Sequence, residues 1–400
     1  MKLRTSCFNK TAFFKAITRF APLWAVYFIG GVLIMLTFTQ RSGEQAHYYS
    51  ASDTAATIGY FAAINGIYAG LAAQLLFGDL FNSRMCNALH ATPLRRETWF
   101  FTHLLAGLAF SIVPNTLGIL LILPRLGAFW FVAFLWLLGM TLEYLFFFGL
   151  AVFSMFCTGN RFAMVAVYGI LNFASVIARW FCAVVFAPML YGVSFPEKPF
   201  LLLCPVVNLA QNEQWVNWDW KDVSGKLYHR EYFFDGLAGP WTYLWVIAAI
   251  GVALLAVSLL LYRRRKLESA GDFIAVQPLA PIFSVVFSLC AGAVFAMLGE
   301  ITNSFYLPYL LVGTLVGYFG GQMLLQRRVK VFGKRTLLKA GVLLTTVFLT
   351  LAVVRLDPLG VTRWVPEEKD VASVTISDSA YYSKYNQTLF TAESTEDIQT

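Results

Sequence analysis

The chain has 400 residues, of which 58% are hydrophobic, 16% aromatic and 13% charged, whereas soluble domains carry roughly 25% charged residues. This composition excludes an ordinary soluble domain and indicates a protein whose surroundings are a lipid bilayer. The net charge of +8 comes from basic residues dispersed over several loops, so we expect no nucleic-acid binding.

Residues 1–20 predict a short amphipathic helix that lies in the inner membrane interface. Phe13, Phe14, Ile17 and Phe20 fall on one face at helical spacing, and polar residues fall on the other. A basic tail without regular structure is the alternative interpretation, because positive charge is common before a first membrane span.

Nine apolar runs follow along the chain. A transmembrane helix needs about 20 mostly apolar residues to cross about 30 Å of hydrocarbon, and each run reaches that length. The runs cover residues 21–39, 56–77, 100–123, 126–156, 162–190, 239–262, 279–299, 303–325 and 336–354. The sequence therefore predicts an all-α polytopic membrane protein with about nine transmembrane helices.

The distribution of Lys and Arg predicts the orientation of these spans. Most of the 30 basic residues fall in segments that face the cytoplasm if the N-terminus is inside. Nine spans then put the C-terminus outside, in a multi-pass protein of the plasma (cytoplasmic) membrane. The predicted divisions are an interfacial helix at 1–20, a six-helix core at 21–262, three additional spans at 263–354 and an outer tail at 355–400.

The outer loop at 191–238 contains an apolar stretch that is too short to span and then three tryptophans, Trp215, Trp218 and Trp220. Tryptophan collects at the level of lipid headgroups. We expect a re-entrant or surface-lying helical hairpin here. The tail at 355–400 is too short to bury a core of its own, so it predicts either the start of an incomplete outer domain or a docked tail.

The loop at 78–99 between the second and third runs combines charge with a proline turn. Arg84 follows the second run, where a basic residue suits the inner headgroups. Pro93 ends a short helix, because the residue before a proline avoids helical geometry. Glu97 opens the third span, where an anion suits a helix N-terminus. The sequence therefore predicts two helices that meet at a stiff corner.

The residues Leu89-His-Ala-Thr-Pro-Leu-Arg-Arg96, between Arg84 and His103, resemble the cytoplasmic signature of type-2 ATP-binding-cassette (ABC) permeases. The chain is most similar to the long permeases of Gram-positive bacteria. The resemblance implies a loop that contacts a separate ABC ATPase subunit, and a second permease copy or a homologous permease as a further partner. It assigns the ATPase contact to Arg84, Thr92, Pro93, Arg95, Arg96 and Glu97. An ordinary basic inner loop is the alternative.

The chain carries no G-x-x-x-x-G-K-[ST] phosphate loop, so we do not expect it to hydrolyse ATP or to act as an enzyme. Its six cysteines lack C-x-x-C spacing, and we expect neither a metal site nor a cofactor.

Glu143 and Arg179 lie near the middle of long apolar runs. Ionisable residues are costly there, and a buried pair would satisfy both charges. Contact with a substrate is a second possibility, and extension of both side chains to the membrane interfaces is a third. A proton-coupled transporter also uses such residues, which keeps that class open.

Small residues at four-residue spacing allow two helices to approach closely. Such positions are Gly66 and Gly70 in the second run and Gly313, Gly317 and Gly321 in the eighth. They predict helix packing within the chain, with a subunit interface as the alternative.

These patterns predict the membrane permease subunit of an ATP-driven exporter, coupled to a separate ATPase through residues 78–99. An ion- or proton-coupled secondary transporter is the first alternative, and a membrane sensor or scaffold subunit that does not transport is the second. The aromatic, weakly polar spans are compatible with lipids, hydrophobic peptides or antibiotics as cargo, and they do not distinguish among these.

Overall fold

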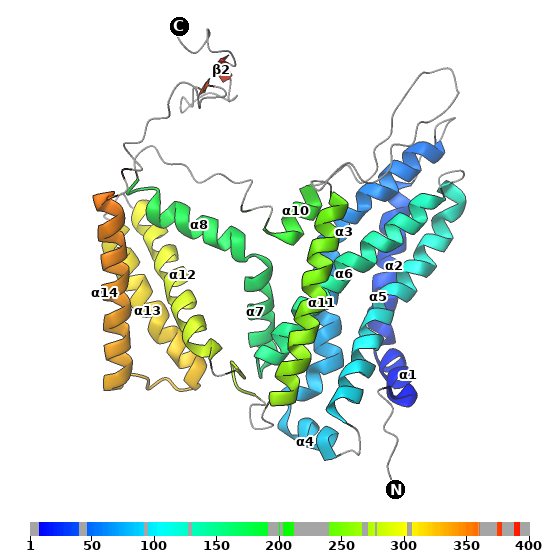
Figure 1. Cartoon of the computed structure of the whole chain (residues 1–400), viewed down its shortest axis with the longest axis horizontal. Coiled ribbons are helices and arrows are strands. Elements are labelled where there is room, and N and C mark those ends of the chain that lie inside the picture. The colour runs from blue at the N-terminus through cyan, green and yellow to red at the C-terminus, as the bar shows by residue number, and fades with distance from the viewer. Residues whose placement is uncertain are drawn as a thin grey trace.

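The computed structural model describes residues 8–39, 46–91, 95–126, 130–190, 200, 203–211, 240–265, 271–276, 278–301, 306–358, 360, 374–377 and 388–392. Over these residues the chain is almost entirely helical (Figure 1). Eight described helices are long and apolar enough to cross a membrane, or nine if one bent pair counts as a single span. This confirms a helical membrane protein with several spans.

The larger of two packing units, the main unit, contains the long helices of the N-terminal half together with α11 (Figure 1). Their apolar sequences form helices because in a bilayer every backbone polar group must be satisfied within the segment. The helices are α1 (Lys10–Arg19), α2 (Ala21–Phe38), α3 (Ala46–Phe77), α5 (Arg96–Leu126), α6 (Phe131–Cys157), α7 (Arg161–Asn172) and α11 (Pro240–Arg264).

Helix α1 begins at Lys10 and is capped by Asn9, whose side chain accepts a hydrogen bond from the Ala12 amide at 3.1 Å. Its buried strip contains Ala16, with Phe13, Ile17 and Phe20 packed on the core. Phe14 is 53% exposed and is not covered by the rest of the chain. Helix α1 packs on α5, and the Trp24 indole of α2 donates to the Ile17 carbonyl at 3.3 Å.

The predicted span at 162–190 is broken. Helices α7 and α8 (Ala174–Phe186) meet at Phe173 with a bend of 71°. The Asn172 side chain donates to the Tyr168 carbonyl at 2.9 Å, and the Cys204 thiol donates to the Asn172 carbonyl at 3.4 Å. These bonds supply partners to backbone groups next to the break. Helix α7 rises from the end where α4 (Ser83–Ala91) lies, and α8 runs sideways toward α12 (Leu279–Ile301) (Figure 1).

The second unit consists of α8, α12 (Leu279–Ile301), α13 (Tyr306–Gln326) and α14 (Lys334–Leu356). Its centre joins Val185 of α8 to Ala293, Ala296, Leu310 and Leu351. The predicted six-helix core included α8, whereas in the structure this helix packs with the three C-terminal spans.

The outer segments are described in part. Helix α10 (Pro205–Gln211) packs against α3, and the remainder of the predicted hairpin, including its three tryptophans, lies outside the described residues. In the predicted tail, β1 (Val374–Ser377) and β2 (Thr388–Ala392) form an antiparallel pair in which Ile376 lies opposite Phe390.

Candidate functional site

The loop between α3 and α5 forms a short 3-10 turn, η1 (Gly78–Phe81), and then helix α4 (Ser83–Ala91). The Asn82 side chain caps α4 by accepting from the Arg84 amide at 3.0 Å. Cys86 is 4% exposed, whereas Ser83, Arg84 and Asn87 are exposed. Among the residues of α4 whose burial is described, Cys86 is buried and the polar residues are exposed. The helix lies beyond the ends of the long helices (Figure 1).

The first residues of α5 bind the C-terminal end of α11. Arg96 Nη1 donates to the carbonyl oxygens of Tyr262 at 3.2 Å, Arg263 at 3.2 Å and Arg265 at 3.3 Å. The last carbonyls of a helix have no partner within the helix, so Arg96 caps α11. Glu97 adds a salt bridge to Arg263 at 3.2 Å. We call this set of contacts the Arg96 joint.

An aromatic cluster lies directly behind the Arg96 joint. Phe77 of α3 and Trp99 of α5 have ring centroids 5.3 Å apart, and Phe156 of α6 and Tyr262 of α11 are 5.2 Å apart. Trp99 also lies 5.7 Å from Tyr262, and Phe77 lies 5.6 Å from Phe156. All four rings are buried, so the ends of four helices are packed through one cluster.

Burial changes the pKa of two groups that lie near the Arg96 joint and outside the spans, Cys86 and Arg265. Burial raises the pKa of the Cys86 thiol. Burial also lowers the pKa of the Arg265 guanidinium, which donates to the Met155 carbonyl at 3.1 Å. The Arg265 contact connects the end of α6 with the residue that follows α11.

The residues predicted to contact an ATPase therefore divide into groups. Arg84 and Arg95 are exposed. Arg96 and Glu97 contact the end of α11, and both stay partly exposed. Thr92 and Pro93 lie outside the described residues.

Glu143 is completely buried in the main unit. Its Oε2 atom accepts from the Asn65 side-chain amide at 3.1 Å, and Asn65 accepts from the Tyr27 hydroxyl at 2.7 Å. Its Oε1 atom has no hydrogen-bond partner within the described part of the chain.

The predicted ion pair between Glu143 and Arg179 does not form. The carboxylate contacts Asn65 of α3, and Arg179 lies half-buried on α8. The bend at Phe173 explains the separation, because it directs α8 away from α6 and against α12. A continuous fifth span, as assumed from the sequence, would have kept α8 in the main unit.

The predicted packing glycines face neighbouring helices of the same chain. A Cβ at Gly70 would lie 3.2 Å from the Tyr168 ring, and the Tyr168 hydroxyl donates to the Gly66 carbonyl at 2.7 Å. A Cβ at Gly317 would lie 2.9 Å from the Ser288 Cα. Gly313 and Gly321 face the same helix, α12.

Sequence reasoning did not find three features of the main unit: the aromatic cluster, the polar group of Asn65 and Tyr27, and the crossing of α6 and α11 at Gly149 and Gly251. A Cβ at Gly251 would lie 2.7 Å from the Leu145 carbonyl oxygen. Aromatic residues at helix ends were the available signal for the first feature. No periodic pattern marks the other two.

No family model, no curated protein and no solved structure matches this chain. Among the described residues, no three or more His, Cys, Asp or Glu side chains gather in a way that could hold a metal ion. Functional inference therefore depends on the geometry of the α4 region and of the buried Glu143 cluster.

Proposed function

We propose that this chain is the membrane permease subunit of an ATP-driven exporter, on which a separate ATPase subunit acts through residues 78–99. The observation that carries the proposal is helix α4, a short helix with exposed polar residues that lies between α3 and α5 in the chain and buries Cys86. Arg84 and Arg95 are exposed around it and available to a soluble partner. The resemblance of this loop to type-2 ABC permeases supports an ATPase as that partner.

The charge distribution supports a cytoplasmic position for α4, and hence a plasma-membrane protein. Helix α4, the end of α11 and the connection between α13 and α14 lie at the same end of the molecule (Figure 1). These segments carry Arg84, Arg263, Arg264, Arg327 and Arg328. Cytoplasmic loops carry such an excess of basic residues. With α7 and α8 counted as one crossing, the C-terminal strands then face outward.

The mechanism follows from the contacts around α4. A displacement of α4 by the ATPase moves the start of α5, and the Arg96 joint passes this movement to α11. The aromatic cluster passes it to α3 and α6. Packed interfaces change between discrete arrangements and do not deform continuously, so a small movement is converted into a change of helix packing. Alternating access or lateral extrusion between two permease bundles would follow.

The test is co-purification from the native membrane followed by an ATPase assay. We expect the double substitution Arg84→Glu and Arg95→Glu to reduce the associated ATPase activity at least about tenfold, because two attractive charges become repulsive. The variant should insert normally. Arg328→Glu is the matched control, since Arg328 is exposed at the same end of the molecule but distant from α4 in sequence. Unchanged ATPase association in the double variant would contradict the proposal.

Glu143 supports a second candidate, a proton-coupled carrier, because an ionisable residue is buried inside the main unit with one oxygen unpartnered. The two functions are separable in vesicles that contain the purified chain alone. Transport that a protonophore and Glu143→Gln both abolish, with no ATPase present, would identify the carrier. Transport that requires an added ATPase and tolerates Glu143→Gln would identify the exporter.

A further inference from the structure

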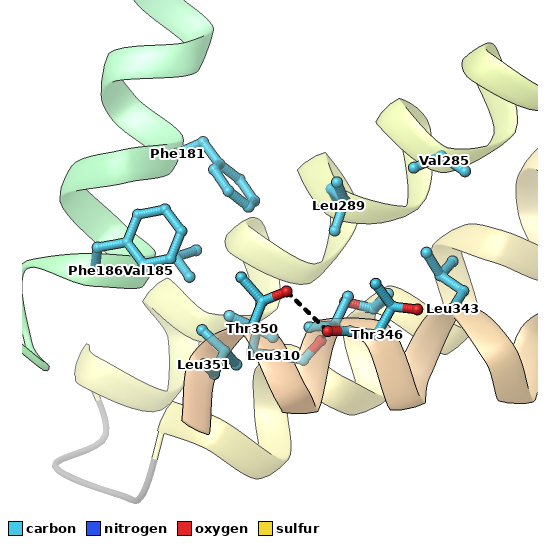
Figure 2. Close-up of a pocket in the computed structure, with 12 residues that line it drawn as sticks. Phe181, Val185, Phe186, Val285, Leu289, Leu310, Leu343, Thr346, Thr350 and Leu351 are labelled. Atoms are coloured by element: carbon cyan, nitrogen blue, oxygen red, sulfur yellow. Dashed lines mark hydrogen bonds between the residues drawn. The ribbon is translucent and has the colours of Figure 1, made fainter. Parts of the chain in front are cut away.

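The second unit contains an apolar cavity of about 210 Å³ between α8, α12, α13 and α14. Figure 2 shows Phe181 and Phe186 of α8 on one side, Leu289 of α12 above, and Leu310 and Leu351 near the end where α13 begins. The cavity runs along α14 from Leu343 to Leu351, so its long dimension follows the direction of the spans.

The three hydroxyl groups in the lining are already satisfied. Thr314 donates to the Leu310 carbonyl at 2.7 Å, Thr346 to the Val342 carbonyl at 2.9 Å and Thr350 to the Thr346 carbonyl at 2.9 Å. The cavity therefore offers no free donor to a polar ligand. Water is a poor occupant for the same reason, because a buried water needs two or more polar partners.

Helix α14 is poorly covered by protein. Ala340 and Leu351 are its buried residues, whereas Leu338, Leu349 and Val353 are exposed. An empty apolar cavity lacks partner atoms for its lining and forfeits their dispersion contacts. In a bilayer, the apolar material that adjoins such a helix on every uncovered side is the acyl chains of lipids. We therefore expect a lipid acyl chain to occupy the cavity.

Polar groups lie at one end of the cavity. The Tyr306 hydroxyl, one turn before Leu310, is buried and has no hydrogen-bond partner among the described residues. Arg355 follows Leu351 by one turn and is exposed. An unpartnered donor beside an exposed guanidinium is the arrangement that an anionic headgroup requires.

We propose that this cavity binds one acyl chain of an anionic phospholipid from the bilayer, with Tyr306 and Arg355 holding the phosphate of its headgroup. The lipid fills the space between α14 and the rest of the second unit and fastens α14 to it. The inference requires the bilayer setting alone and is independent of the proposed ATPase.

The experiment uses the purified full-length chain in detergent, titrated with dioleoyl-phosphatidylglycerol or dioleoyl-phosphatidylcholine. Native mass spectrometry counts the bound lipids, and thermal unfolding reports their effect on Tm. We expect one phosphatidylglycerol to bind about tenfold more tightly than phosphatidylcholine, a difference of about 1.4 kcal/mol. Both lipids carry the phosphate, but the choline ammonium of phosphatidylcholine is repelled by the Arg355 guanidinium, whereas phosphatidylglycerol is net anionic. Arg355→Gln and Tyr306→Phe should each reduce this preference, and Val347→Phe should fill the cavity and abolish binding.

Two matched controls lie on the same helix. Leu349→Phe adds similar bulk on the exposed side of α14, and Arg335→Gln removes a charge at its other end. Both should keep the preference for phosphatidylglycerol. Equal affinity for the two lipids in the unmodified chain would overturn the proposal, as would retained binding in Val347→Phe. If Val347→Phe does not fold, an unchanged preference in Tyr306→Phe together with Arg355→Gln is sufficient to reject it.

Discussion

At the scale of single residues, Glu143 shows how a buried polar group is tolerated among apolar helices. Asn65 provides its hydrogen bond, and Asn65 is itself held by Tyr27. The chain of three side chains connects α2, α3 and α6. Removing one member leaves a buried donor or acceptor without its partner, which costs more than the bond itself contributes.

We predict that Glu143→Gln changes the free energy of unfolding by less than about 1 kcal/mol, because an amide oxygen also accepts from Asn65. Glu143→Ala should destabilise the chain by roughly 2–4 kcal/mol, since it leaves Asn65 unsatisfied and creates a cavity. Thermal unfolding in detergent measures both. Equal effects of the two substitutions would show that the hydrogen bond to Asn65 does not matter.

Cys86 gives a prediction about pH. A raised thiol pKa means that less thiolate is present at any given pH, so alkylation by a maleimide should be slow near pH 8 and rise only at higher pH. The comparison is a single-cysteine chain with native Cys86 against one with Asn87→Cys and Cys86→Ala, because Asn87 is the exposed neighbour. Coincident pH profiles for the two thiols would contradict the burial of Cys86.

At the scale of elements, the crossing of α6 and α11 depends on two glycines. Gly149 and Gly251 let the two backbones approach, and a Cβ at Gly251 would collide with the Leu145 carbonyl oxygen. We expect Gly251→Ala to destabilise the chain by about 1–3 kcal/mol through overpacking. Gly341→Ala on α14 is the control, because nothing lies within 4 Å of its added Cβ. A better helix former should stabilise there by about 0.5–1 kcal/mol. Thermal unfolding should give a lower Tm for Gly251→Ala and a higher Tm for Gly341→Ala.

The positions of most spanning helices could be predicted from the sequence, since bilayer thickness fixes the length of an apolar run. The break at Phe173 could not, because residues 162–190 are predominantly apolar and contain no proline before Pro188. The Arg96 joint could not be predicted from the sequence either. Arg96 looks like an ordinary basic loop residue, and its partners at the end of α11 lie more than 160 positions away.

At the scale of the whole molecule, the helices form two packing units. The order of helices along the chain does not predict which unit a helix belongs to. Helix α8 follows α7 directly but packs with α12. The link between the units includes backbone bonds from the Gly271 amide to the Gly159 carbonyl at 2.7 Å and from the Ala275 amide to the Cys157 carbonyl at 2.9 Å. These bonds tie the linker after α11 to the corner between α6 and α7, close to α4.

Substitutions at the neighbouring residues Arg95 and Arg96 should separate docking of the ATPase from transmission of movement between helices. Under the proposed function, exposed Arg95 contacts the ATPase, whereas Arg96 carries movement from α5 to α11. Arg95→Leu should weaken ATPase association and leave stability unchanged. Arg96→Leu should keep the ATPase bound and lower the free energy of unfolding by roughly 1–3 kcal/mol, because the carbonyls at the end of α11 lose their donor.

The proposed movement of α11 can be measured directly. A cysteine placed at Leu260, which is 55% exposed, should change its maleimide labelling rate when ATP is added to the complex with its ATPase. Arg96→Leu should abolish this change while the ATPase remains bound. The contact from Arg96 is to backbone oxygens, so Arg96→Lys should restore part of the response through its own donors. An ATP-dependent change that persists in Arg96→Leu would mean that movement reaches α11 by another route, such as the aromatic cluster.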